Sequence, residues 1–240
     1  MLSADEKKMH DDFIRTFNKL ERYLRSTEKS NDRYSSFSSL INQSKNRIIS
    51  IPENRDLLFL AADLRNIMVH NHEVAYPSMD FLRRFKSLVQ KITHPLIAEK
   101  IMIPFSQIKM CQIEDTLFDA YQLMKIYRLS NIPVMQINRL VGVFNESTIF
   151  TQFINEDGEI LADLTSVHFI DVLDKIRIAK QPSVKYHFVS RKKDIYHLFD
   201  YFKTEDNIEK KTELLFVTEN GNENEALLGL ISVFEVVRHV

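Results

Sequence analysis

The sequence is poor in the residues that build several common kinds of site. Its single cysteine, Cys111, excludes a disulfide framework and any multi-cysteine zinc or iron–sulfur centre, and a lone thiol fits a reducing compartment. Its four glycines cannot form the glycine-rich phosphate loop of P-loop or dinucleotide-binding enzymes. The apolar runs fall short of the ~18 residues of a membrane-spanning helix, and the polar start of the sequence predicts no signal peptide. We therefore expect a cytoplasmic chain with no membrane segment and no required cofactor.

Charge is balanced over the whole chain but divided unevenly along it. The 240 residues contain 32 Lys and Arg against 33 Asp and Glu. Residues 1–92 hold 16 basic and 12 acidic side chains, and the remainder holds 16 and 21. All four glycines lie in the second part. This shift, together with a change in apolar periodicity, predicts an α+β protein with a mildly basic helical part followed by a mixed part.

Apolar residues at intervals of three and four predict a helical bundle over residues 1–92. Ser3 and Glu6 have the spacing of a capping box, and the helix that they open places Phe13, Phe17, Leu20 and Leu24 on one face. Further helices are expected over residues 36–47 and 53–71, and after Ser78, which can cap a last helix. These segments make a small bundle of four or five helices.

The second part alternates strands and helices, and the alternation occurs twice. The first copy has strand candidates at 107–112, 131–137 and 139–144, with a tight turn at Asn138-Arg139, and helix candidates at 116–129 and 146–154. The second copy has strand candidates at 184–189, 213–219 and 226–232, and helix candidates at 192–202 and 233–240. Gly142 aligns with Gly229 between the copies. We therefore expect domains over residues 93–156 and 157–240.

This repeat resembles a tandem pair of CBS (cystathionine-β-synthase) domains. The first copy carries EKIM, EDTLFDA, NIPV and LVGVF in order, and the second keeps LLFVTENG and LLGLISVFEVV. The resemblance implies small sheets with flanking helices. It also implies a regulatory ligand that contains adenosine, such as AMP, ADP, ATP or a related adenylate.

The resemblance also suggests ligand-binding residues. In the CBS family, the second hairpin strand ends in Gly, two apolar residues, Thr or Ser, two variable residues and Asp; the hydroxyl contacts phosphate and the carboxylate accepts from the ribose. These positions are Gly229, Ser232 and Glu235 in the second copy, and Gly142, Asn145 and Thr148 in the first. The first copy lacks the carboxylate, so the second is the better candidate. The alternative is that neither copy binds a ligand and the pair is a dimerising scaffold.

One motif in the helical part suggests chemistry. Arg65 and Asn66 are followed by His70, a pattern that resembles the motif of HEPN domains, which are helical bundles that often cleave RNA without a metal. Arg65 would stabilise the scissile phosphate, His70 would move a proton and Asn66 would orient the ribose or a water. A pair of histidines such as His70 and His72 is more often a polar helix end than a metal site, so no metal is expected.

Together these features predict a regulatory protein. The CBS-like pair would sense an adenine nucleotide and control the HEPN-like bundle, which would act as a metal-independent endoribonuclease on an RNA substrate. Both modules commonly self-associate, so a homodimer is expected. The alternative is a non-enzymatic nucleotide sensor or scaffold dimer whose helical part docks a protein partner.

Overall fold

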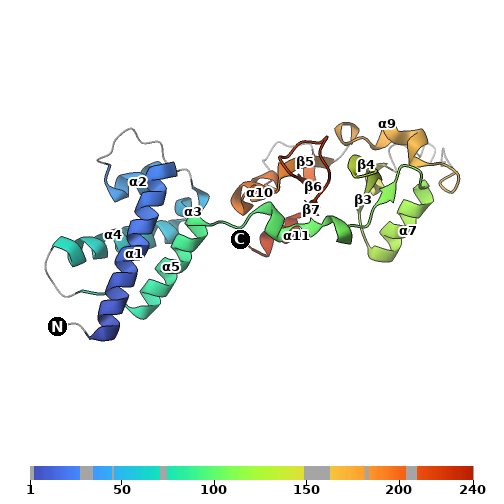
Figure 1. Ribbon diagram of the computed structural model, residues 1–240. Helices are drawn as coiled ribbons and strands as arrows, with labels where there is room; N and C mark the ends of the chain where they lie inside the picture. Colours follow the sequence, from blue (N-terminus) through green and yellow to red (C-terminus); the bar gives the residue numbers. More distant parts are fainter. Residues whose placement is uncertain are drawn as a thin grey trace. The chain divides into compact units, whose positions relative to one another are not determined.

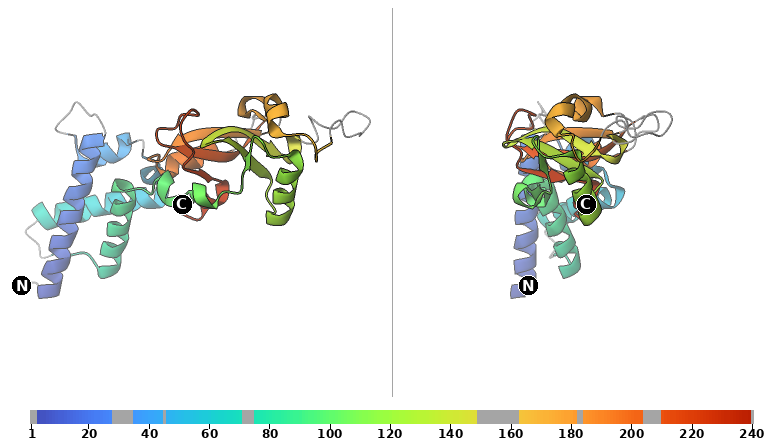
Figure 2. Two further views of the ribbon diagram at one scale, coloured as in Figure 1. Left: turned by 45° about the vertical axis from the view of Figure 1, so that its right-hand side comes forward. Right: turned by 90° about the vertical axis from the view of Figure 1, so that its right-hand side faces the viewer.

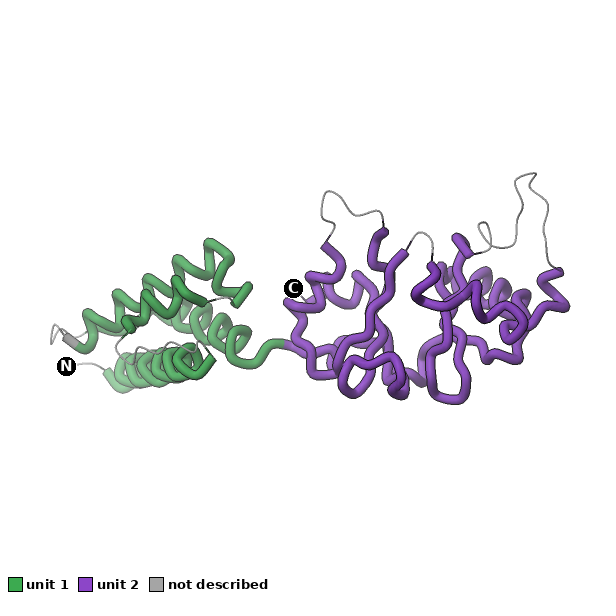
Figure 3. The backbone as a smooth tube through the Cα atoms, turned by 90° about the horizontal axis from the view of Figure 1, so that it is seen from above, with its two compact units in different colours: residues 1–95 green, residues 96–240 purple. Residues whose placement is uncertain are grey.

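The computed structural model describes residues 3–27, 35–44, 46–70, 75–148, 163–181, 184–203 and 210–239. The chain divides into two compact units, residues 1–95 and residues 96–240, which Figure 3 colours separately. The first unit is helical, and the second contains two small sheets with helices beside them. Each unit is described by itself below.

The first unit is a bundle whose helices begin at the predicted caps. Its helices are α1 (Ala4–Thr27), α2 (Phe37–Gln43), α3 (Arg47–Ser50), α4 (Pro52–His70) and α5 (Met79–Thr93), shown in Figure 1. Ser3 and Glu6 form the capping box of α1, with backbone-to-side-chain hydrogen bonds of 2.7 and 3.2 Å. The Ser78 side chain accepts from the Phe81 N–H at the start of α5. The predicted helix starts are therefore confirmed at both positions.

Phenylalanine rings fill the centre of this bundle. Phe13 and Phe17 of α1 are buried against Phe85 of α5, with the Phe13 and Phe85 ring centroids 5.3 Å apart. Phe37 of α2 packs on Phe17 with a centroid distance of 4.4 Å. Tilted aromatic pairs at these distances add to the stabilisation from burying their area. The apolar periodicity of the sequence thus identified the faces of α1 and α5 that form the core of this bundle.

The helix predicted over residues 36–47 ends early, and a second short helix follows it. Helix α2 ends at Gln43, and α3 starts at Arg47 after Asn46, which has extended backbone angles. The Asn46 N–H donates to the Ser44 hydroxyl, and the Asn46 side chain accepts from the Ile48 N–H. Short polar side chains compete with helical backbone bonds in this way, which explains why this helix ends four residues before the predicted position.

The second unit contains a three-stranded and a four-stranded sheet. The first has the order β2 (Cys111–Gln112), β3 (Asn131–Gln136), β4 (Arg139–Asn145). The second has the order β1 (Ile103–Pro104), β7 (Gly229–Ile231), β6 (Lys211–Thr218), β5 (Val184–Ser190). Helix α7 (Leu117–Tyr127) packs against β3, and α11 (Val233–Val237) follows β7 next to α10 (Ile195–Tyr201). Residues from the two sheets, among them Met135, Val143, Phe216 and Leu230, form one shared core.

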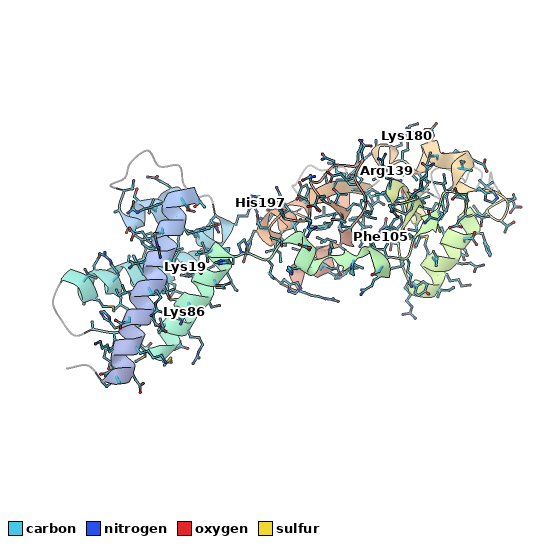
Figure 4. The ribbon with its side chains drawn as sticks, viewed as in Figure 1. Lys19, Lys86, Phe105, Arg139, Lys180 and His197 are labelled. Atoms are coloured by element: carbon cyan, nitrogen blue, oxygen red, sulfur yellow. The ribbon has the colours of Figure 1, made fainter. Side chains whose placement is uncertain are left out.

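Two segments cross from one repeat to the sheet of the other. The N-terminal crossing segment, residues 96–107, contains α6 (Ala98–Ile101), β1 and the 3₁₀ helix η1 (Phe105–Gln107), and pairs through β1 with β7. The central crossing segment, residues 163–181, contains η2 (Phe169–Val172), α9 (Leu173–Ile176) and η3 (Ile178–Lys180). In Figure 2 the orange α9 lies against β4 in both views. Figure 4 marks the two segments by Phe105 and Lys180.

Equivalent backbone hydrogen bonds hold the two crossing segments. Ala98 N donates to Lys193 O, and Ile195 N donates to Leu96 O, both at 2.8 Å. Likewise Leu117 N donates to Val167 O at 3.0 Å, and Phe169 N donates to Asp115 O at 3.1 Å. Each crossing segment is thereby fixed at the N-terminus of the helix in the opposite repeat. The two repeats form one interlocked unit.

Some local predictions for this unit were wrong. Of the strand predicted over residues 107–112, only Cys111–Gln112 is a strand; Gln107 belongs to η1, and residues 108–110 are irregular. The turn residues between β3 and β4 are Ile137 and Asn138, one position earlier than predicted, and Ile137 has φ +60°. The predicted last helix ends at Val237. Of the helix predicted over 146–154, residues 146–148 are helical and 149–154 lie outside the described residues.

Candidate functional site

A cleft of about 380 Å³ lies between the two repeats, beside the N-terminus of α11. Its apolar walls come from Ile103 of the N-terminal crossing segment, from Ile108 just after that segment, and from Leu230 of β7. Ser232 and Phe234 line it from the start of α11, and 70 % of Phe234 is exposed. An exposed aromatic ring next to a hydroxyl and apolar side chains can take a flat ring with a polar substituent.

Cations outnumber carboxylates around this cleft. Lys109, Arg128 and Lys211 line it, against one carboxylate, Glu213. Arg128 ends α7 in a left-handed conformation with φ +54°, and the Lys109 ammonium lies 4.7 Å from the centroid of the Tyr127 ring. The arrangement favours an anionic ligand, because Arg and Lys donate to phosphate oxygens. Sequence reasoning missed these side chains because they come from α7, β6 and the residues after η1, which are distant along the chain.

Ser232 and Glu235 form a capping box at the start of α11. The Ser232 hydroxyl accepts from the Phe234 N–H at 3.2 Å, and the Ser232 N–H donates to Glu235 Oε2 at 2.9 Å. The Ser232 hydroxyl also lies 2.5 Å from that carboxylate oxygen. Of the three residues predicted in the second copy, only Ser232 lines the cleft, and Glu235 is engaged with its own helix.

Gly229 and Gly142 lie where the crossing segments touch the sheets. A Cβ atom on Gly229 would come within 2.6 Å of the Ile103 carbonyl oxygen and 2.6 Å of the Met102 sulfur. A Cβ atom on Gly142 would come within 2.7 Å of the Ile176 carbonyl oxygen. Both glycines therefore allow a close backbone approach.

The corresponding residues of the first copy are buried. Asn145 is 3 % exposed and Thr148 is fully buried. The Asn145 carboxamide oxygen accepts from the Thr148 N–H at 2.8 Å, which places Asn145 as the cap of the helix that starts at residue 146. Its nitrogen donates to Gln181 and Tyr186, so the structure joins Asn145 and Thr148 to side chains of the central crossing segment and β5. Burial raises the pKa of Tyr186, which keeps its hydroxyl neutral.

Comparison with known protein families identifies part of this unit. The family model described as "CBS domain" matches residues 98–155. Residues 98–155 are a CBS domain. This confirms the predicted CBS resemblance for the first repeat. CBS domains are typically regulatory nucleotide-binding modules.

Solved structures also align with the chain, and two of the three described next are CBS domains. Hypoxic Response Protein I with two coordinated zinc ions is 14 % identical, with 60 % of this chain and 99 % of that chain covered and a TM-score of 0.43. The CBS domain of a bacterial CNNM/CorC family Mg²⁺ transporter with ATP is 19 % identical, with 60 % and 85 % covered and a TM-score of 0.41. The CBS domains of a Streptococcus pneumoniae transcriptional regulator are 21 % identical, with 60 % and 98 % covered and a TM-score of 0.41. The comparison with curated proteins finds no match.

The helical unit places the other candidate residues on α4. Asn66 is exposed, Arg65 is partly exposed, and the Arg65 Nη1 atom lies 3.5 Å from the Asn66 carboxamide oxygen. His70 is the last residue of α4, and its side chain lies outside the described residues. The structure therefore brings Arg65 and Asn66 together at the surface of one helix.

Other candidate groups carry no site. Cys111 is buried in β2 of the three-stranded sheet, and burial raises its thiol pKa to about 12, so the nucleophilic thiolate is not populated near neutral pH. Within the described ranges, no three His, Cys, Asp or Glu side chains are grouped to hold a metal ion. Among these same residues, no helix has both the length and the apolar character needed to cross a membrane.

Proposed function

We propose that the paired repeats bind an adenine nucleotide in the cleft beside Ser232 and thereby regulate the helical unit. The observation that carries the proposal is the cleft itself, which combines the Ser232 hydroxyl, the exposed Phe234 ring and three cations next to a CBS domain. The base would pack against Phe234 and the apolar wall, and the phosphates would accept from Lys109, Arg128 and Lys211. A ligand with a positive charge, such as S-adenosylmethionine, is disfavoured by the same cations.

Nucleotide binding is tested by calorimetry and thermal shift with AMP, ADP, ATP, S-adenosylmethionine and cyclic di-adenylate. Ligand at 100 times its Kd should stabilise the chain by about 2.7 kcal/mol. Lys211→Gln should weaken nucleotide binding by about ten- to a hundredfold, because it removes a charged hydrogen-bond donor to phosphate. Ser232→Ala should also weaken it, because it removes a hydroxyl that lines the cleft. Lys192→Gln changes an exposed lysine that does not line the cleft and serves as the control. The absence of binding by every ligand would reject this function.

For the output, we propose that the helical unit is a HEPN-like endoribonuclease that acts through Arg65, Asn66 and His70. The proximity of Arg65 and Asn66 on an exposed helix surface supports this. Arg65 would stabilise charge on the scissile phosphate, His70 would transfer the proton and Asn66 would orient the ribose. In a homodimer, two copies of the motif would meet at one RNA.

The output is tested by RNA cleavage in EDTA with the full chain. His70→Ala should lower the cleavage rate by about a hundredfold or more, because general acid–base catalysis contributes that much. His72→Ala alters a neighbouring histidine outside the motif and serves as the control. If both variants cleave like wild type, the catalytic assignment fails.

The alternative is a non-enzymatic sensor or scaffold dimer whose helical unit docks a partner. Nucleotide binding without RNA cleavage under any condition would favour it, since the CBS part would then work without a catalytic output.

A further inference from the structure

The end of β4 carries a closed network of buried polar side chains. Asn145 Nδ2 donates to Gln181 Oε1 at 3.0 Å and to Tyr186 Oη at 2.8 Å. Gln181 Nε2 donates to Val143 O at 2.8 Å and to Ile176 O at 3.0 Å. The Tyr186 hydroxyl donates to the Asn131 carboxamide oxygen. Every side-chain N–H and O–H of Asn145, Gln181 and Tyr186 therefore has an acceptor within the protein.

The same network uses the groups that would face a ligand in the first repeat. The Thr148 hydroxyl lies 3.1 Å from Asn145 Oδ1 and 3.3 Å from Gln181 Oε1. Gln181 is 1 % exposed and Tyr186 is 6 % exposed. Polar groups that are buried and satisfied in this way are costly to separate, because each would lose its partner before it meets a ligand. In the described part of the first repeat, the groups equivalent to those beside Ser232 are therefore bonded to the chain itself.

The connection from η3 to β5 is longer than the equivalent connection from η1 to β2, and it supplies side chains of the polar network. Cys111 pairs with Val134, which faces Gly142, and Val189 pairs with Val217, which faces Gly229. Cys111 and Val189 are therefore equivalent positions of the two repeats. Cys111 is the fourth residue after η1, whereas Val189 is the ninth residue after η3.

The longer connection, from η3 to β5, contributes side chains to the polar network. The connection includes Gln181 and Tyr186, both of which enter the network. The shorter connection of the other half provides Ile108 and Lys109, which leave the cleft beside Ser232 open. The longer connection therefore supplies two side chains of the network, whereas the shorter connection supplies side chains that line the cleft beside Ser232.

We propose that this network is a permanent plug: the first half-site is closed to ligands, and the pair takes a single nucleotide. Gln181 is a positioning residue of the plug, because its carboxamide joins β4, α9 and the capped helix. The number of ligands rests on the function proposed above, whereas the closed half-site does not. An asymmetric pair of this kind responds to its ligand through one half alone.

The plug is tested first without any ligand, by amide hydrogen exchange on the full chain. The Thr148 N–H is bonded to Asn145 and fully buried, so its exchange should be slowed at least about a hundredfold relative to an unprotected amide. Gln181→Ala should accelerate it, and Thr148→Val, which keeps the side-chain volume, should preserve most of the protection. Exchange at the unprotected rate in wild type would show an open half-site and overturn the proposal.

The second arm is titration of the same protein with ATP. One ATP per chain is expected, with an affinity that Thr148→Val leaves within about twofold. Two ATP per chain, or a large loss of affinity in Thr148→Val, would overturn the single-ligand proposal. A slowly exchanging Thr148 amide with no bound ATP would reject the proposed nucleotide function and leave the plug established.

Discussion

Single glycines determine how closely the crossing segments approach the two sheets. Gly142→Ala would put a methyl group 2.7 Å from the Ile176 carbonyl oxygen, and Gly229→Ala would put one 2.6 Å from that of Ile103. Backbone atoms cannot yield as side-chain ends can, so each substitution should lower the free energy of unfolding by about 1–3 kcal/mol. Urea denaturation of each variant measures this change.

The control for these variants is Ser87→Ala, on the exposed side of α5 in the helical unit. It should change stability by no more than about 0.5 kcal/mol. If Gly142→Ala and Gly229→Ala behave like this control, the close approach does not contribute to folding. A loss of nucleotide binding with unchanged stability would instead favour the ligand-binding role that the family motif assigns to these glycines.

The residue scale also shows why the candidate site was only partly predictable. The spacing from Ser232 to Glu235 is shared by the family's ligand motif and by a capping box, and the structure uses it as a capping box. Ser232 lines the cleft at the predicted position, but Lys109, Arg128 and Lys211 meet it only through tertiary folding. The burial of Asn145 depends on Gln181 and Tyr186, which no local pattern connects to it.

At the scale of elements, local chemistry predicted where most helices begin. Thr116 caps α7 with Asp119 as its reciprocal partner, as Ser3 and Glu6 do for α1. Such caps act over three or four residues, so a sequence displays them completely. The apolar stripe of α5, in which Leu82, Phe85 and Val89 are buried, can be predicted from the sequence for the same reason.

The crossing segments are the elements that the sequence did not reveal. β1 is close in sequence to β2, but it pairs with β7, and Ile103 lies opposite Leu230. The central crossing segment packs Phe169 and Ile176 into the core of the first sheet. Pairing over such separations depends on which surfaces remain uncovered after the local elements form, and periodicity contains no information about that. The fold class was thus accessible, whereas the interlocking was not.

At the scale of the whole molecule, one covalent path connects the helical unit with the cleft. The helical unit ends at Pro95, and the N-terminal crossing segment begins at Leu96. Glu99 in this segment accepts from Arg191 at 2.6 Å, and Ile103 and Lys109 further along line the cleft. A nucleotide held by Lys109 would therefore contact a segment that is continuous with α5. Regulation requires only that the nucleotide favour one arrangement of this segment over another.

Insertion of Gly-Ser-Gly-Ser between Pro95 and Leu96 tests this path. The inserted residues are flexible, so they should uncouple α5 from the crossing segment and leave the cleft intact. Nucleotide affinity should stay within about twofold of wild type, whereas the effect of nucleotide on RNA cleavage should disappear. If the chain does not cleave RNA, the measurement is the nucleotide-dependent change in hydrogen exchange at Val89 and Ile92 of α5, which the insertion should abolish.

A control insertion of the same residues before Ser3 should preserve the effect. An undiminished effect in the Pro95 insertion would mean that the coupling runs outside the crossing segment, through contacts between the subunits of a dimer.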